Sequence, residues 1–174
     1  MAVIEAIATT YLEADAASVT FSSIPATYEH LQLRMNIRTL RTSNLETTGM
    51  QLNGDTAGNY ETHRMYGQTT STAAGGEVAT TRLYATGQMP TSIMPPRTLY
   101  GAGLVDFLDY ANSNKNTTIL FQSGENDDTY PYMTFGSGLW EDTSAVSTIL
   151  LYPANGSAGF MRGSVFTLYG LKSS

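Results

Sequence analysis

The chain has 174 residues and no cysteine, and it carries a net charge of −6 at pH 7 with a sequence pI near 4.7. From this length we predict one domain, 1–174. The acidic net charge excludes the basic surface that direct nucleic-acid binding requires. Because there is no cysteine, disulfides and thiolate metal sites are excluded. Glu5 and Glu13 stand where a signal peptide needs positive charge, and no apolar run approaches the roughly 18 residues that cross a membrane, so we expect neither secretion nor a membrane partner.

Residues 1–12 are the first candidate element, and 1–16 could extend from the domain as an N-terminal arm. The spacing of Val3, Ile7 and Leu12 fits a helical turn, whereas the start of the chain also fits an edge strand. We predict the strand and keep the helical turn as the alternative.

The clearest alternation of apolar and polar residues covers 30–39, HLQLRMNIRT. Apolar residues from Leu31 to Ile37 alternate with polar residues that end at Arg38, which predicts a strand with one buried face and one wet face. The preceding segment 18–25, SVTFSSIP, predicts a short strand that ends at its proline.

Asn53-Gly54 predicts a turn between strand-like residues 50–52 and the run 59–67. Two later segments have loop composition: 67–77 is small, polar and flexible, and 86–98 is apolar and stiffened by prolines. The further strand candidates are 78–86, 98–110, 116–124, 130–140, 144–153 and 160–172.

These segments amount to about eight or nine short strands separated by Gly, Asn and Pro, and no stretch keeps a helical period, which predicts an all-β antiparallel sandwich or jelly roll of lectin-like type. The terminal segment 163–174, GSVFTLYGLKSS, has apolar residues on both faces. A free terminus frays unless a sheet holds it, so we predict that this segment is a central strand of the core.

Catalytic candidates are few. His30 and His63 are the two histidines, and neither stands in a nucleophile motif. Asp106 and Asp109 would point to opposite faces of a strand, and the acidic residues of 125–128 are typical of a solvated hairpin tip. We therefore predict no catalytic residue, no cofactor and no metal ligand.

Two binding alternatives stay open. Segments 52–59 and 124–128 carry oxygen donors that could hold calcium, although neither follows the spaced ligand pattern of known calcium loops. Aromatic residues at Tyr130, Tyr132, Phe135 and Trp140 either stack on a glycan or fill the core, and Tyr130, Tyr132 and Trp140 are the candidate glycan-stacking residues.

The loop QMPTSIMPPR combines apolar side chains with prolines. Stiff proline-rich backbone and adaptable methionines suit docking against a partner, because ordering such a loop costs little entropy. In the alternative, the loop folds back and caps the core of its own domain. The candidate interface residues are Met89, Ile93, Met94, Pro95 and Pro96.

Two patterns carry a resemblance to a known family. One is a strand that ends in Ile-Pro and is followed by tyrosine and an L-x-L strand, here Ile24, Pro25, Tyr28, Leu31 and Leu33. The other is a C-terminal G-S-x-F-x-L-Y-G-[IL], here 163–171, and the segments LNGDTAGNY and VDFLDYANSNKNTT lie between them. Together they resemble β-sandwich structural proteins of tailed bacteriophages and prophages, seen as capsid cement or decoration proteins and in tail or fibre components.

The resemblance covers nearly the whole chain, and its motifs are architectural, not chemical. It implies a non-enzymatic virion protein, assembled in the host cytoplasm, that acts as capsid cement by binding the major capsid protein and itself as a dimer or trimer. The alternative is a tail-fibre or receptor-binding domain that binds carbohydrate. A virion glycosidase is disfavoured by the lack of a credible acid/base pair.

Overall fold

A computed structural model describes residues 3–43, 46–94, 98–126 and 131–172. Within these ranges no helix is long and apolar enough to cross a membrane. The described strands are β1 (Val3–Tyr11), β2 (Val19–Phe21), β3 (His30–Ile37), β4 (Glu46–Leu52), β5 (Tyr60–Gln68), β6 (Ser71–Thr80), β7 (Leu83–Met89), β8 (Gly101–Leu108), β9 (Thr117–Glu125), β10 (Tyr132–Trp140), β11 (Ile149–Pro153) and β12 (Val165–Lys172).

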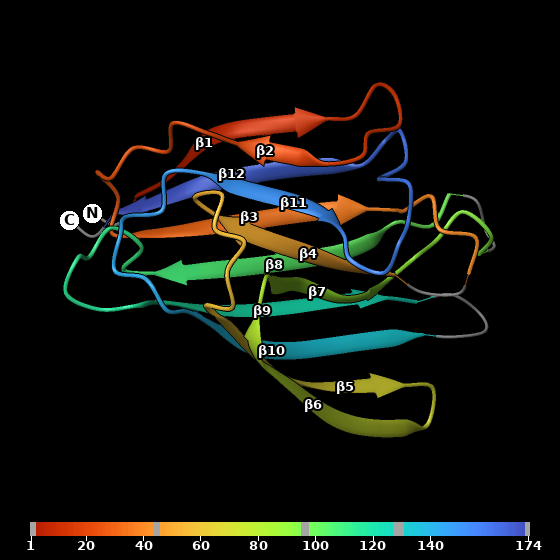
Figure 1. The fold of residues 1–174 in the computed structure, drawn as a ribbon. Coiled ribbons are helices and arrows are strands. Elements are labelled where there is room, and N and C mark those ends of the chain that lie inside the picture. Colours follow the sequence, from red (N-terminus) through yellow and green to blue (C-terminus); the bar gives the residue numbers. More distant parts are fainter. Residues whose placement is uncertain (1–2, 44–45, 95–97, 127–130, 173–174) are drawn as a thin grey trace.

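The strands form two antiparallel sheets that pack face to face as a β-sandwich (Figure 1). The larger sheet has the order β1-β12-β3-β8-β9-β10-β5-β6, and the smaller has the order β2-β11-β4-β7. Strand β7 packs over β9 and β10. The predicted all-β sandwich is confirmed, with more strands than the about eight or nine expected of such a chain.

The core lies between the two sheets, because alternate residues of each strand face the opposite sheet. In β9 and β10 the buried and the more exposed residues alternate along the strand. The buried apolar side chains form one cluster, and its largest fully buried members include Leu31, Leu33, Ile37, Met50, Tyr60, Phe107, Phe121, Trp140, Phe160 and Phe166.

The segment 67–77, predicted as a flexible loop, is instead part of a hairpin. Strand β5 continues to Gln68, and β6 pairs with it in antiparallel register from Ser71 onward. Most side chains of β6 are exposed, so its backbone hydrogen bonds to β5 hold it in place, not side-chain burial. A strand of this kind shows no apolar alternation, which is why the prediction was wrong.

Asn53 and Gly54 form the predicted turn, with φ values of 52° and 71°. The backbone N–H of Asp55 donates to the Leu52 carbonyl at 2.9 Å and closes it. The flanking strands do not pair with each other, since β4 belongs to the smaller sheet and β5 to the larger. The turn therefore carries the chain from one sheet to the other.

Both ends of the chain are built into the larger sheet. Strand β12 lies between β1 and β3, so the terminal strand is paired on both sides as predicted, although it lies next to the edge strand β1 and is not central in the sheet. Its Phe166 and Leu168 face the core, whereas Val165 and Leu171 are only half-buried on the other face. Strand β1 confirms the predicted N-terminal strand, and its pairing with β12 corrects the expectation of an arm over 1–16.

Candidate functional site

The larger sheet has an outer face, the one turned away from the smaller sheet, and no described strand packs on it. Strand register aligns the outward side chains of neighbouring strands in rows across this face. One such row runs from β6 to β12 through Ala74, Met65, Phe135, Gln122, Leu104, Arg34 and Thr167. The rows show which side chains meet on the surface although they lie far apart in the sequence.

The outer face carries a group of exposed apolar side chains toward its β6 end. Met133, Met65 and Phe135 keep 69%, 61% and 52% of their surface exposed. Phe135 lies opposite Met65 in the β10–β5 ladder, and the exposed Leu120 of β9 and the half-buried Leu104 of β8 continue the group. We call these five residues the outer patch. Contiguous exposed apolar surface of this kind marks interaction sites in soluble proteins.

A hollow of about 690 Å³ lies within the outer patch, over β8, β9 and β10. Ala102 and Gly124 are register partners in its floor, and Gly124 also lies opposite Met133. Because the floor residues have one side-chain carbon or none, Met133 and Phe135 stand above it. The hollow can accept a protruding side chain from a partner, which is how central interface residues usually bind.

Polar side chains border the outer patch on β3 and β8. Nε of Arg34 donates to Oε1 of Gln32 at 2.8 Å, and Nε2 of Gln32 donates to Oδ1 of Asp106 at 2.8 Å. The Arg34 guanidinium lies 5.0 Å from the centre of the Tyr169 ring. An apolar centre with a solvated polar rim is the usual anatomy of a protein interface.

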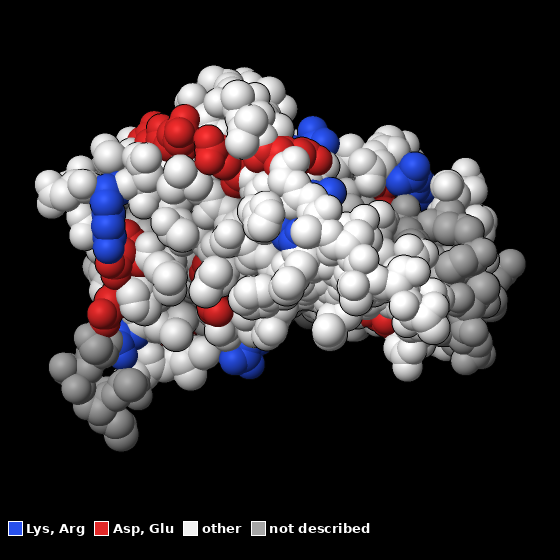
Figure 2. All heavy atoms as spheres, turned by 90° about the horizontal axis from the view of Figure 1, so that it is seen from below, with Lys and Arg blue, Asp and Glu red and all other residues white. Residues whose placement is uncertain are grey.

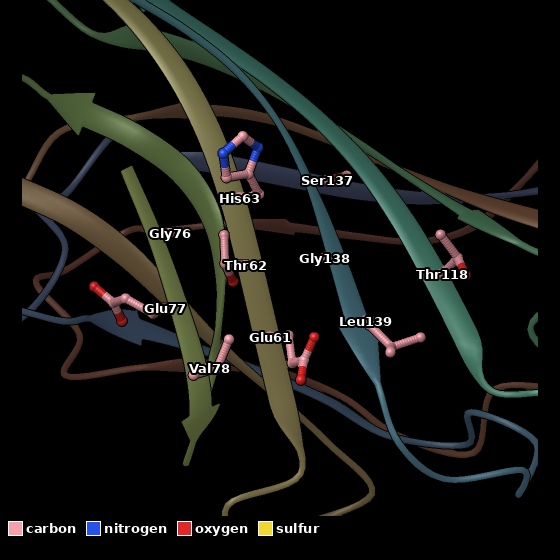
Figure 3. A pocket seen from close by; sticks show the side chains of 10 residues that line it. All are labelled: Glu61, Thr62, His63, Gly76, Glu77, Val78, Thr118, Ser137, Gly138 and Leu139. Carbon is pink, nitrogen blue, oxygen red and sulfur yellow. The ribbon is translucent and has the colours of Figure 1, made fainter. Parts of the chain in front are cut away.

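A second hollow, near the start of β5 and the end of β10, contains His63 (Figure 3). His63 is the register partner of Ser137, and Glu61 lies two residues away on β5. In Figure 3 the side chains of His63 and Glu61 point apart. A nucleophilic triad needs hydrogen bonds that join serine, imidazole and carboxylate, and in the described part of the chain none joins these three. The residues line the hollow without forming a triad.

Glu29, His30 and Asp109 bring potential metal-ligand atoms within 4.8 Å of one another. Nδ1 of His30 accepts a hydrogen bond from the Asp109 backbone N–H at 3.0 Å. The Asp109 carboxylate is bound by the Lys115 ammonium, which lowers the pKa of Asp109. A metal ion would have to displace these contacts, which together hold the turn where Asp109 has a φ of 50°.

The Asp55 carboxylate, in a segment considered for calcium, is used inside its own loop. It accepts hydrogen bonds from Nε1 of Trp140 at 2.8 Å, from the backbone N–H of Ala57 at 2.8 Å and from Nδ2 of Asn59 at 3.0 Å. The Trp140 hydrogen bond is the main cause that lowers the pKa of Asp55. Both oxygens of the Asp55 carboxylate therefore already accept hydrogen bonds. The carboxylate orients the Trp140 side chain, and a cation would have to replace these hydrogen bonds to bind.

The second acidic segment, 124–128, also differs from what the sequence predicted. Glu125 is buried at the end of β9, so the prediction of a solvated hairpin tip is wrong for this residue. Asp127 and Asp128 lie outside the described residues. Asp106, on the outer face, is bound by Gln32 and is therefore part of the polar rim.

The aromatic residues considered for glycan stacking do not form an exposed row. Tyr132 and Trp140 are buried on the core side of β10, and Tyr132 stacks on Tyr66 with ring centres 5.3 Å apart. The core alternative is thus confirmed for these two, and Tyr130 lies outside the described residues. Phe135, on the opposite side of β10, is exposed.

For the loop that follows β7 the sequence left two alternatives open, docking against a partner or folding back over its own domain. The structure shows the second, because the loop lies back on the sandwich. Met89 ends β7, and both it and Met94 are buried, so the expectation that the loop displays its methionines is wrong. Ile93 is exposed. Pro95 and Pro96 lie outside the described residues.

Arg38 explains why this loop folds back. Its fully buried side chain donates from Nε to the Thr91 carbonyl at 2.9 Å, from Nη1 to the Leu99 carbonyl at 3.2 Å and from Nη2 to the Met94 carbonyl. A guanidinium has five N–H donors in a fixed fork, so it can satisfy several loop carbonyls at once. The alternation along β3 predicted a wet Arg38, which is wrong because the loop covers it.

The different environments of Ile93 and Met94 make a direct test. Met94→Asp should destabilise the domain by about 3 kcal/mol or more, because it buries a carboxylate among apolar groups. Ile93→Asp should change stability by about 0.5 kcal/mol or less, since its side chain is exposed. Urea unfolding of both variants measures the difference, and a Met94→Asp protein as stable as Ile93→Asp would contradict the buried position.

The residues that carry the family resemblance contact one another. The Tyr28 ring packs on Gly170 so closely that a Cβ at Gly170 would lie 2.3 Å from it. The Tyr110 hydroxyl donates to the Pro25 carbonyl, and Oγ of Ser164 accepts from the backbone N–H of Arg38 at 3.2 Å. The two patterns thus meet in space and fasten the C-terminal strand to the chain around β3.

Comparison with protein-family models, with curated proteins and with solved structures found no match for this chain. The candidate site therefore follows from the residues themselves. The outer patch was missed from the sequence, although 132–140 carries a signal: Met133 and Phe135 are apolar at the alternate positions to Tyr132 and Trp140. Apolar residues on both faces of a strand indicate contacts on both sides of its sheet.

Proposed function

We propose that this protein is a non-enzymatic structural subunit of a tailed-phage virion, and that it acts through protein–protein contacts of its outer patch. The observation that carries this proposal is the exposure of Met65, Met133 and Phe135 together on a sheet face that no described strand covers. Burying such side chains against a partner is favourable by about 25 cal/mol for each Å² removed from water.

The assigned role is that of a capsid cement or decoration protein, with the major capsid protein as its partner. Support comes from the resemblance of the Ile-Pro-Tyr and G-S-x-F patterns to phage sandwich proteins. Their residues, such as Tyr28 and Gly170, serve packing, as expected of architectural motifs. A single outer patch binds weakly, and subunits repeated over a shell combine many weak contacts through high effective concentration.

The outer patch makes the proposal testable. Met133→Asp combined with Phe135→Asp should lower binding to emptied capsids of the encoding phage by at least about tenfold, because charges replace apolar contacts at the interface centre. Co-sedimentation with capsids measures the binding. Ile93→Asp is the matched control, since Ile93 and Phe135 are both 52% exposed but Ile93 lies outside the outer face.

Two outcomes would contradict the proposal. Unchanged capsid binding of the double variant would remove the outer patch from the interface. Binding to glycans but not to capsids would favour the carbohydrate-binding alternative, for which Phe135 is the exposed aromatic of β10. The number of copies per particle, measured by mass spectrometry, separates a capsid position from a tail position, since a repeated shell holds many more copies than a tail.

A further inference from the structure

Strand β6 is an edge of the larger sheet, and no described strand pairs with its outer side. From Ser71 to Glu77 it runs in continuous register with β5. Glu77 is its one charged residue, and the strand contains neither proline nor lysine. An open edge without such blocking residues presents unpaired backbone N–H and C=O groups to another strand.

The opposite edge of the same sheet is blocked. The register of β1 with β12 shifts between Ala6 and Ala8, and such a bulge bends an edge away from pairing. Glu5 is exposed and lies opposite Gly170, against which Tyr28 packs, so it places a charge at this edge. Charges and bulges are the devices that natural sheets use to limit edge pairing, and on β6 both are confined to one end, where Glu77 lies and where the register with β5 shifts between Thr62 and Tyr60.

We propose that two copies of this chain pair in antiparallel fashion through their β6 strands, about a two-fold axis at Ala74. The larger sheet then continues from one subunit into the other. The interface is a property of the chain by itself and does not depend on a role in a virion.

The sequence of β6 is self-complementary about Ala74. In this register Thr72 lies opposite Gly76 of the second copy, and Ala73 lies opposite Gly75. Each larger side chain therefore meets a glycine. Ser71 lies opposite Glu77, where its hydroxyl can donate to the carboxylate, as charge-assisted hydrogen bonds favour.

The charge distribution also favours a second copy of this chain as the partner of strand β6. Oε1 of Glu77 lies 3.9 Å from Nη1 of Arg64 and accepts a hydrogen bond from the Tyr84 hydroxyl at 2.8 Å, so its charge is compensated within its own subunit. In the proposed register the two Glu77 residues are on the order of 20 Å apart, beyond the Debye length. Figure 2 views the molecule from the β6 end, and the surface there is mostly uncharged. Two acidic chains can approach each other at this end.

The pairing has a consequence for the outer patch. Antiparallel strands in one sheet are related by an axis perpendicular to that sheet, so both outer faces point to the same side. Met65 and Phe135 lie one and two strands from the edge. The two outer patches would therefore be neighbours and would present one larger apolar surface.

Single-cysteine variants test the interface cleanly because the chain has no cysteine. Ala74→Cys should form a disulfide-linked dimer under mild oxidation. Thr72→Cys and Gly76→Cys should cross-link weakly alone and strongly when the two proteins are mixed, because they face each other across the axis. Ala6→Cys on β1 is the control for the blocked edge and should stay monomeric.

Light scattering on the unmodified chain gives an independent readout. The mass should rise with concentration from 18.8 kDa to twice that value, and Ala74→Lys should abolish the rise, because it places two ammonium groups at the axis. A mass of 18.8 kDa at every concentration would overturn the proposal. Equal cross-linking at Ala6 and Ala74, or cross-linking of Ala74→Cys only to a different protein in particles, would also overturn it.

Discussion

Truncation of Leu168 to alanine is expected to lower the free energy of unfolding by about 2 to 5 kcal/mol, and Phe166→Ala by about 3 to 5 kcal/mol. Both side chains are fully buried on the core face of β12, a strand that is paired on both sides. The Phe166 ring meets Phe160 edge-on with centres 5.0 Å apart, so its loss leaves a cavity that the sheet cannot close. Urea unfolding followed by Trp140 fluorescence measures the loss.

Leu171→Ala is the matched control, because it makes the same substitution on the same strand but on the half-buried outer face. We expect a loss of about 1 kcal/mol or less. Equal losses for Leu168→Ala and Leu171→Ala would contradict the assignment of the core to one face of β12.

Replacement of Arg38 by methionine is expected to cost about 3 to 5 kcal/mol, although it keeps most of the side-chain volume. The substitution removes the donors to the carbonyls of Thr91, Met94 and Leu99. A buried acceptor that loses its partner costs about 1 to 3 kcal/mol, and truncating one partner of a buried charged network costs more than a single bond. Urea unfolding measures the effect.

Hydrogen exchange separates loosening of the loop from a general loss of stability. The amides of Ser92 and Met94 bond to the carbonyls of Arg41 and Thr91, and both should exchange faster in Arg38→Met under conditions where the core strands stay protected. Arg34→Met, at an exposed position of β3, should leave stability and exchange near those of the unmodified chain. If Arg38→Met were as stable, and exchanged its amides as slowly, as Arg34→Met, the role of Arg38 as an anchor of the loop after β7 would be contradicted.

Local patterns predicted those parts of the fold whose causes are themselves local. The alternation from Leu31 to Ile37 predicted β3 because side chains of a strand point to alternate faces. Asn53-Gly54 predicted its turn because both residues tolerate positive φ. The apolar segment around Phe166 predicted an interior strand, since burial needs neighbours on both sides.

Features set by distant parts of the chain were predicted poorly. In the sequence, Arg38 follows the alternating polar residues of β3 and is expected to be exposed. It is buried only because the loop after β7 covers it. Met94 and Ile93 are adjacent apolar residues with no difference in pattern, yet one is buried and the other exposed. Strand β6 carries no pattern of its own, because its pairing with β5 defines it.

The sequence by itself determined the all-β class, the turn at Asn53 and the interior position of the terminal strand, because each follows from backbone preferences or from side-chain alternation within a few residues. The tertiary structure decided which apolar residues stay exposed. In the sequence, Met133 and Phe135 look like core residues. They stay exposed in the outer patch because the smaller sheet covers only the other face of β10. Only the order of strands, which leaves β6 at an edge, decides where a second chain could pair.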